Sequence, residues 1–281
     1  SEIDKYAIKV LDKNFSNITH LGDIRKINHN KLPKIDLLIG GSPCQDLSIA
    51  QKGDGLKGKK SNLFYDYVNL LKSIKPKYFL LENVINKWSN KMGEELGVYG
   101  VKINSNLFSA QNRPRMYWSN IDFDKLPTQL KDANLSSLID DNVDEKYFLD
   151  SNKSSFINGK KLNINKSKDG IIKLITAEKE FIRDNERQRR IYSIDGKSPT
   201  LLARSDSPKI LINDRIRKLT PLECERLQGF PDNWTGELSD TQRYKLIGNA
   251  FSIEVISYIL KFLKKKPTST RNIITLYDKV Y

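Results

Sequence analysis

A single cysteine stands at a position where the chain could form a covalent bond. Cys44 follows the apolar run 35–39, which has the length and composition of a buried strand. Between them, the glycines and proline of residues 40–43 let the backbone leave the sheet. Reaction sites of open α/β sheets lie at the carboxyl ends of strands, where a thiolate can act as a nucleophile. Most free cysteines are buried structural residues, so residues 40–45 alone leave the two interpretations about even.

Three other segments carry polar side chains beside apolar runs. Glu82 ends a second apolar run, Arg113 and Arg115 come just before a third, and residues 244–250 hold a Gly-Asn pair in an expected loop before a helix. Each has an ordinary explanation: a salt bridge at a strand end, a solvated surface, or a simple turn. In isolation, the ordinary explanation is favoured for each of them.

The elements that would position these residues alternate between strand and helix patterns. The expected strands are 35–39, 78–81, 98–103 and 116–121, and the expected helices are 6–11, 63–74, 221–228 and 252–263. Strands separated by helices predict an α/β fold with a doubly wound, mostly parallel sheet.

The composition changes near residue 124, which divides the chain into three parts. Residues 1–123 are predicted to form a catalytic α/β domain, residues 124–242 a smaller irregular domain, and residues 243–281 a return to the first domain. Within the middle part, residues 151–217 hold 16 Lys and Arg against 8 Asp and Glu, so they carry +8 of the net charge. This part is therefore the expected binding surface for a polyanion.

The overall composition narrows the class of protein. The 281 residues include 48 Lys and Arg against 34 Asp and Glu, a net charge of +14. Two cysteines are too few for a disulfide scaffold and favour a reduced intracellular setting. No apolar run approaches the roughly 18 residues of a membrane span. We expect no membrane partner and no metal site.

Taken together and in order, the segments resemble the DNA (cytosine-5)-methyltransferase family. The matching blocks are Pro-Cys-Gln, Glu-Asn-Val, Gln-x-Arg-x-Arg, residues 221–231 and the late Gly-Asn pair. The resemblance covers essentially the whole chain. It implies methyl transfer from S-adenosylmethionine to carbon 5 of cytosine in a specific duplex DNA sequence. A cytoplasmic role in a bacterial or phage-infected cell, in restriction–modification or phage self-protection, would follow.

The resemblance also implies a role for each catalytic candidate. The Cys44 thiolate would add to carbon 6 of cytosine, which makes carbon 5 nucleophilic toward the methyl donor. Glu82 would protonate or hydrogen-bond N3 of the base, helped by a pKa that apolar neighbours raise. Arg115 would bind O2 of the base, and Arg113 would brace the site.

The target base must be turned out of the duplex for this chemistry, and basic residues would hold the DNA. In the family, a loop matching residues 51–61 closes over the extruded base. The expected phosphate contacts beside it are Ser48, Lys57, Lys59 and Lys60. The segment 191–201 resembles the end of the family's target-recognition region. The candidates for base or phosphate contacts there are Arg187, Arg189, Arg190 and Arg204.

The residues expected to bind the cofactor form an incomplete set. Glu2 would bind the ribose hydroxyls and Asp23 the adenine amino group, with Ile24 and Asn249 beside them. The family's Phe-x-Gly-x-Gly loop and the strand before it have no match in the chain. We therefore expect a fragment, a split subunit or a decayed gene product, with the missing strand and glycine loop supplied by a separate chain in the second case. The isolated chain is then expected to bind S-adenosylmethionine weakly.

Two alternatives stay open at this point. The first is a non-catalytic, DNA-binding remnant of such an enzyme, although the intact Cys44, Glu82 and Arg115 argue against it. The second is methylation of cytosine in RNA, which the size and charge of the middle part make less favoured.

Overall fold

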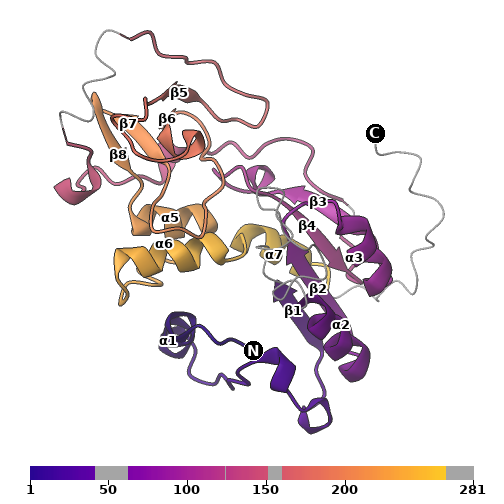
Figure 1. Cartoon of the computed structure of the whole chain (residues 1–281). Coiled ribbons are helices and arrows are strands. Elements are labelled where there is room, and N and C mark those ends of the chain that lie inside the picture. Colours follow the sequence, from indigo (N-terminus) through magenta and orange to yellow (C-terminus); the bar gives the residue numbers. More distant parts are fainter. Residues whose placement is uncertain (42–62, 124, 151–159, 264–281) are drawn as a thin grey trace.

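Two four-stranded sheets form the frame of the protein (Figure 1). The structure is a computed structural model that describes residues 1–41, 63–123, 125–150 and 160–263. The first sheet has the order β1-β2-β4-β3. Its strands are β1 (Leu37–Gly41), β2 (Tyr78–Asn83), β3 (Gly100–Asn104) and β4 (Pro114–Ser119). The second sheet has the order β5-β6-β7-β8. Its strands are β5 (Lys173–Thr176), β6 (Arg190–Ser193), β7 (Lys209–Ile212) and β8 (Arg215–Lys218).

The first sheet is mixed. β1 and β2 are parallel, whereas β4 lies antiparallel between β2 and β3. The connection from β3 to β4 holds one short 3-10 turn, η4 (Ser105–Leu107), and no crossover helix, so the two strands must run in opposite directions. The α/β class expected from the sequence is confirmed, with a sheet more mixed than expected. Within the described residues, β1 pairs with β2 alone.

Helices cover both faces of the first sheet. On one face, α2 (Leu63–Ile74) and α3 (Ser89–Leu96) pack on Phe79, Leu81 and Trp118. On the other face, α7 (Ile253–Leu260) packs with Val255 and Ile259 on the opposite side chains of the same strands. Because side chains alternate along a strand, the apolar run of β2 supplies both layers.

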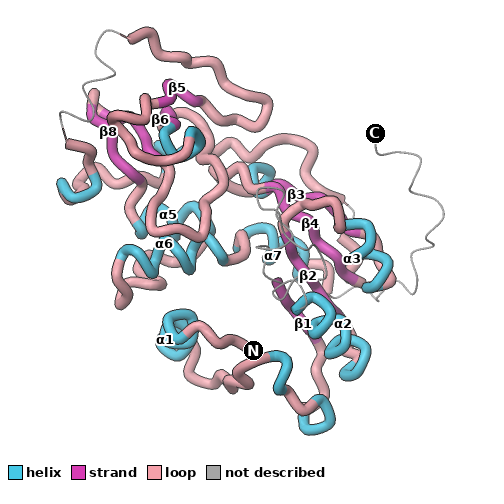
Figure 2. Tube along the Cα trace, viewed as in Figure 1, coloured by secondary structure: helices cyan, strands magenta, loops and turns pink. Residues whose placement is uncertain are grey.

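The second sheet occupies the segment that the sequence indicated as irregular. Its strands have four residues each, too short for a clear alternation of apolar and polar residues. β7 and β8 form a hairpin whose turn residues, Asn213 and Asp214, have φ angles of 47° and 57°. Such angles are typical of the two-residue turns that join antiparallel strands. Long loops surround this sheet (Figure 2).

Two helices follow the second sheet and lead back to the first. α5 (Pro221–Gln228) begins with a capping box between Thr220 and Glu223, and α6 (Asp240–Asn249) follows it. Both lie below the second sheet in Figure 1, and they share an apolar cluster with residues of that sheet. The loop expected over 244–250 is wrong: these residues belong to α6 up to Asn249. Gly248 lies against a neighbouring backbone there, so close packing rather than a turn accounts for the glycine.

The N-terminal segment lies along one side of α6. It contains α1 (Lys5–Asn14) and two 3-10 turns, η1 (Ile24–Lys26) and η2 (His29–Lys31). The Nδ2 atom of Asn14 donates to the carbonyl of Trp234, and Lys245 forms an ion pair with Asp4. Residues 1–36 contain no strand. Among the described residues, no helix combines the length and the apolar character needed to span a membrane.

Candidate active site

The carboxyl ends of β1 and β2 bring two of the predicted segments together. The parallel ladder pairs Gly41 with Glu82, and Gly41 is three residues before Cys44 in the chain. A Cβ atom at Gly41 would lie 3.0 Å from the Phe251 ring and 3.6 Å from the Oε2 atom of Glu82, so a side chain would crowd this exit. Cys44 lies outside the described residues, as do Ser48, Lys57, Lys59 and Lys60.

A second glycine keeps the end of β1 close to α2. A Cβ atom at Gly40 would lie 2.6 Å from the ring of Tyr67. The Tyr67 hydroxyl donates to the carbonyls of Leu38 and Leu80, each at 3.3 Å, and so joins α2 to both strands. The glycines at the end of β1 are therefore needed for packing as well as for the turn of the chain.

Glu82 and Arg115 form an ion pair at this edge. The Nε atom of Arg115 lies 3.0 Å from the Oε1 atom of Glu82, and the two side chains are 13% and 12% exposed. The antiparallel ladder pairs Glu82 with Tyr117, which makes Arg115 the diagonal neighbour on the same face. Burial raises the pKa of Glu82 above its ordinary value, while the charges of Arg115 and Arg113 oppose this rise. Burial has the larger effect.

Arg113 binds backbone carbonyls from two distant segments. Its Nη1 atom donates to the carbonyl of Leu201, and its Nη2 atom donates to the carbonyls of Gly248 and Ala250, each at 2.9 Å. The side chain is 3% exposed. Arg113 thus links the residue that precedes β4 to the segment after β6 and to the end of α6.

Gln228 is a buried residue of the site that sequence analysis missed. Its Nε2 atom donates to the carbonyls of Ile247 and Ala250, and its Oε1 atom accepts a hydrogen bond from Gln111. It therefore holds the end of α6 against the segment that carries the arginines. The only sign of its importance in the sequence was its position in the block 221–231, which resembles the family. An amide side chain in a helix does not indicate which residue it will contact.

The other cysteine belongs to the core. Cys224 lies in α5 and is 1% exposed, within the cluster that α5 and α6 share with the second sheet. Burial raises the pKa of its thiol well above the ordinary value, so the thiolate is disfavoured. Cys224 therefore has the properties of a structural cysteine.

Two of the expected cofactor segments are adjacent. The Oγ atom of Ser1 donates to the carbonyl of Gly22 at 2.5 Å, which brings the chain at Glu2 beside the chain at Asp23. Glu2 accepts the amides of Ile3 and Asp4 through its Oε1 atom, at 2.7 and 2.8 Å.

Asp23 already has a cationic partner. Both of its carboxylate oxygens accept hydrogen bonds from the Arg25 guanidinium, and these lower the pKa of Asp23 to about 2. An adenine amino group bound there would share the carboxylate with Arg25. Ile24 begins η1 and packs against the cluster under α2, and Asn249 is exposed at the end of α6.

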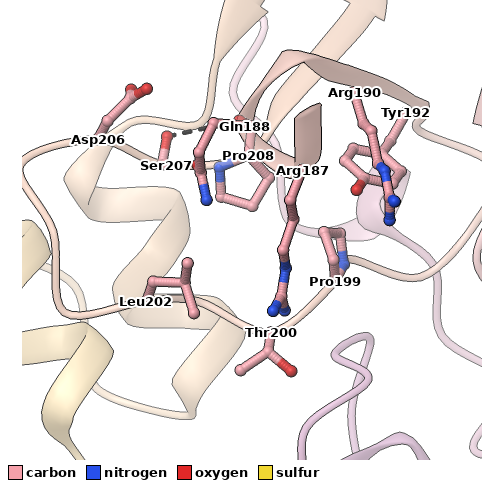
Figure 3. Close-up of a pocket in the computed structure, with 10 residues that line it drawn as sticks. All are labelled: Arg187, Gln188, Arg190, Tyr192, Pro199, Thr200, Leu202, Asp206, Ser207 and Pro208. Atoms are coloured by element: carbon pink, nitrogen blue, oxygen red, sulfur yellow. Dashed lines mark hydrogen bonds between the residues drawn. The ribbon is translucent and has the colours of Figure 1, made fainter. Parts of the chain in front are cut away.

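A polar cavity of about 620 Å³ lies between the second sheet and Asn112, which directly precedes Arg113 in the chain. Its wall includes Asn112, Lys166, Lys173, Arg187, Arg190 and Thr200. A smaller pocket beside it shares several of these residues, and Figure 3 shows the Arg187 side chain there, with its guanidinium pointing toward Thr200. Four cationic and three amide side chains line the large cavity beside one carboxylate, that of Asp169, so the lining carries a net positive charge that suits a polyanion.

The four predicted arginines of this region differ in their partners. Arg189 donates to the carbonyl of Ala177, Arg190 pairs with Glu186 at 2.9 Å, and Arg204 pairs with Asp184 at 3.0 Å. Within the described ranges, the Arg187 guanidinium makes no hydrogen bond or ion pair. Arg187 is therefore the most available of the four for a ligand.

Comparison with known proteins identifies the family. The sequence model of "C-5 cytosine-specific DNA methylase" matches residues 1–265. The chain is 33% identical to the type II methyltransferase M1.ScrFI of Lactococcus lactis subsp. cremoris, over 92% of this chain and 69% of that protein. It is 30% identical to the type II methyltransferase M.HhaI of Haemophilus parahaemolyticus, over 92% of this chain and 84% of that protein.

Solved structures share the fold. The Dnmt2 methyltransferase of S. pombe superposes with a TM-score of 0.68 at 17% identity, over 93% of this chain and 89% of that chain. A putative DNA modification methyltransferase encoded within an E. coli prophage superposes with a TM-score of 0.63 at 22% identity, over 94% and 91%. The resemblance drawn from five sequence blocks is confirmed by these matches, and the chain belongs to the C-5 cytosine-specific DNA methylase family.

Proposed function

We propose that the protein methylates carbon 5 of cytosine within a specific duplex DNA sequence, through a covalent bond between Cys44 and an extruded base. The observation that carries the proposal is the register of the first sheet. It aligns Gly41, three residues before Cys44, with Glu82, which is paired to Arg115. A nucleophile, a carboxyl and a guanidinium can then act on one base.

The chemistry expected of each group follows from its environment. The thiolate of Cys44 adds to carbon 6 of cytosine, and the electron pair of the ring moves toward N3. A protonated Glu82 donates to N3 and so accepts this developing charge, which burial of its carboxyl favours. After methylation, a solvent water takes the carbon 5 proton, the electron pair of that bond re-forms the 5,6 double bond as the thiolate leaves carbon 6, and N3 returns its proton to Glu82. Arg113, whose guanidinium is engaged with backbone carbonyls, positions the strand that holds Arg115.

The methyl donor of this family is S-adenosylmethionine, which supplies the methyl group as an electrophile when bound. The described residues fit its adenosine half. The hydrogen bond from Ser1 to Gly22 holds the two acidic segments together, and no described residue donates to the Oε2 atom of Glu2. That oxygen can accept a ribose hydroxyl, and Ile24, which packs on the cluster under α2, fixes the chain beside Asp23.

Replacing Glu82 with glutamine tests the assignment. Glutamine keeps the shape and one donor but cannot transfer a proton, so methyl transfer into duplex DNA should fall by about a hundredfold or more. In the wild-type protein the rate should decline as the pH rises through the raised pKa of Glu82, because the protonated form is lost. The variant should lack this decline, since its amide does not titrate.

The measurement is incorporation of a tritiated methyl group into duplex DNA across a pH series. Transfer RNA in a parallel reaction distinguishes the alternative of RNA methylation. A Glu82→Gln variant with the wild-type rate and pH profile would contradict the role of the carboxyl. Incorporation into transfer RNA in preference to DNA would contradict the substrate.

Arg187 is the proposed base-reading arginine. Its guanidinium lies in the polar cavity without a partner among the described residues, and an arginine fork matches the O6 and N7 atoms of guanine. Arg187→Lys keeps the charge but loses the fork, so discrimination at one guanine of the target should fall by about 10- to 100-fold. Binding to non-specific DNA should change little.

Sequencing of methylated positions in a random-sequence duplex library measures this discrimination. Arg215→Lys is the matched control, because Arg215 is an exposed arginine of β8 that pairs with Glu145 away from the cavity. If Arg187→Lys weakens binding equally for all sequences, Arg187 contacts phosphate rather than a base.

A further inference from the structure

Lys197 is a buried lysine whose ammonium group contacts only the backbone of distant segments in the part of the chain that the structure describes. It is 2% exposed, and its Nζ atom donates to the carbonyls of Ser109, Lys131 and Ala133 at 2.8, 2.7 and 2.9 Å. An ammonium has three donors, so all of them are used. Among the described residues, Lys197 forms no ion pair. Burial lowers the pKa of Lys197 to about 8, although the charge of the Asp132 carboxylate opposes this fall, and the ammonium remains the main form at pH 7.

The three carbonyls come from segments that matter for the reaction. Ser109 lies just before the segment of Arg113 and Arg115, and residues 131–133 belong to the connection between the two sheets. Lys197 itself follows β6 and precedes Thr200 on the wall of the polar cavity. Its ammonium therefore joins the recognition side of the protein to the catalytic side.

Beside Lys197, the two segments pair as a short parallel ladder. The amide of Ser198 donates to Ala110, and the amide of Asn112 donates back to Ser198, each at 2.8 Å. Gln111 and Ser198 form the bridge pair, and the Thr200 hydroxyl donates to the carbonyl of Asn112 at 2.7 Å. Two backbone hydrogen bonds hold the register between these segments only weakly. If one segment shifted by one residue along the other, each of its side chains would point to the opposite face.

We infer that Lys197 is a positioning residue that fixes the register between residues 197–201 and residues 109–113, and with it the alignment of the base-reading cavity on the catalytic pocket. Lys197 anchors one end of the ladder, and the bond from Arg113 to the carbonyl of Leu201 anchors the other. Gly170 leaves room for this anchor, because a Cβ atom there would lie 3.0 Å from the lysine stem. The effect of this register on methylation rests on the proposed function, whereas the role of Lys197 in holding the register does not.

Lys197→Met tests the inference, since methionine keeps the unbranched stem and removes the three donors. The readout is the ratio between methylation of the best target and of targets that differ by one base pair. This ratio should fall by about tenfold or more, because the energy of a hydrogen bond to a charged group corresponds to at least that factor, and here it favours the aligned register over a shifted one. A variant that is merely less stable would lower methylation of all targets equally and leave the ratio unchanged.

Arg217→Met is the matched control. Arg217 is also buried, but its guanidinium bonds to the Glu223 carboxylate of α5, away from the ladder and from the wall of the cavity. The Arg217→Met variant should be less stable than the wild type and should keep the wild-type ratio. A folded Lys197→Met variant with the wild-type ratio would overturn the inference. If Lys197→Met does not fold, Lys197→Gln, which retains two donors on a shorter stem, replaces it and the same ratio decides.

Hydrogen exchange in the full chain tests the register without any methylation assay. The amides of Ser198 and Asn112 should exchange at least about tenfold faster in the variant, while those of β2 and β4 are unchanged. Equal exchange in both proteins would overturn the inference. If the wild-type protein methylates no DNA, the proposed function fails, and the exchange result still decides the role of Lys197.

Discussion

Replacing Cys44 with serine is expected to lower methyl transfer by at least about a thousandfold, since loss of a catalytic nucleophile removes the covalent route entirely. A serine hydroxyl has nearly the same shape but is far less acidic than a thiol, and no general base for it is evident in the sequence. Folding and DNA binding should be retained, because the substitution changes one atom. The measurement is tritiated methyl incorporation into duplex DNA under single-turnover conditions, combined with a binding assay on the same DNA.

Cys224→Ser is the matched control for this experiment. Cys224 is buried in α5 among apolar residues, so the control should lower stability somewhat and leave the chemistry intact. The opposite pattern, in which Cys224→Ser is folded but inactive and Cys44→Ser is active, would contradict the assignment of Cys44 as the nucleophile.

Gly248→Ala is expected to destabilise the protein by about 3 kcal/mol, at the upper end of the usual cost of overpacking. In an exposed helix the same change would stabilise by about 1 kcal/mol. Here a Cβ atom would lie 2.2 Å from the carbonyl oxygen of Leu202 and 2.6 Å from the amide nitrogen of Ala203, and backbone atoms cannot rotate away. The end of α6 must move, which also weakens the bond from Arg113 to the carbonyl of Gly248.

Urea unfolding and methyl transfer measured on one preparation test this prediction. Thr241→Ala is the control, because Thr241 is exposed in the first turn of the same helix and reports the helical preference of alanine alone. A Gly248→Ala variant as stable as the wild type would mean that α6 does not lie against residues 202–203 in solution.

Helices were predictable from the sequence where apolar residues recur at helical spacing over several turns. The predicted helix 63–74 has the bounds of α2, because Phe64, Tyr67 and Val68 repeat at helical spacing on one face. α6 was not predicted, since its glycine and asparagine indicate a turn when the neighbouring backbone is unknown. α3 was missed for a similar reason: Gly93 interrupts its pattern, and a Cβ atom there would lie 2.8 Å from the carbonyl of Val98.

The sequence predicted which side chains belong to the site, but not the main-chain groups that they contact. The family resemblance implied that Glu82 and Arg115 act on one base, but the strand pattern alone did not. In a mostly parallel sheet, a residue at the end of one strand and a residue before another lie at opposite edges, and it is the antiparallel β4 that brings Arg115 to Glu82. The contacts of Arg113 could not be predicted, since its partners are main-chain carbonyls 88 and 135 residues further along the chain, and a carbonyl leaves no mark in a sequence. Lys197 escaped prediction for the same reason. The roles of Cys44 and of the arginines expected to contact DNA remain predictions that the experiments above address.

The acceptors of the Arg113 guanidinium have a consequence for how this protein could diversify. Every peptide unit offers a carbonyl, whatever residue it belongs to, so the bond from Arg113 itself does not depend on the side chain at position 201, although Leu201 is also buried in the cluster that α5 and α6 share. Exposed positions around the second sheet can therefore vary without breaking this bond. Under the proposed function, such variation would alter the choice of target sequence while the junction to the first sheet is kept.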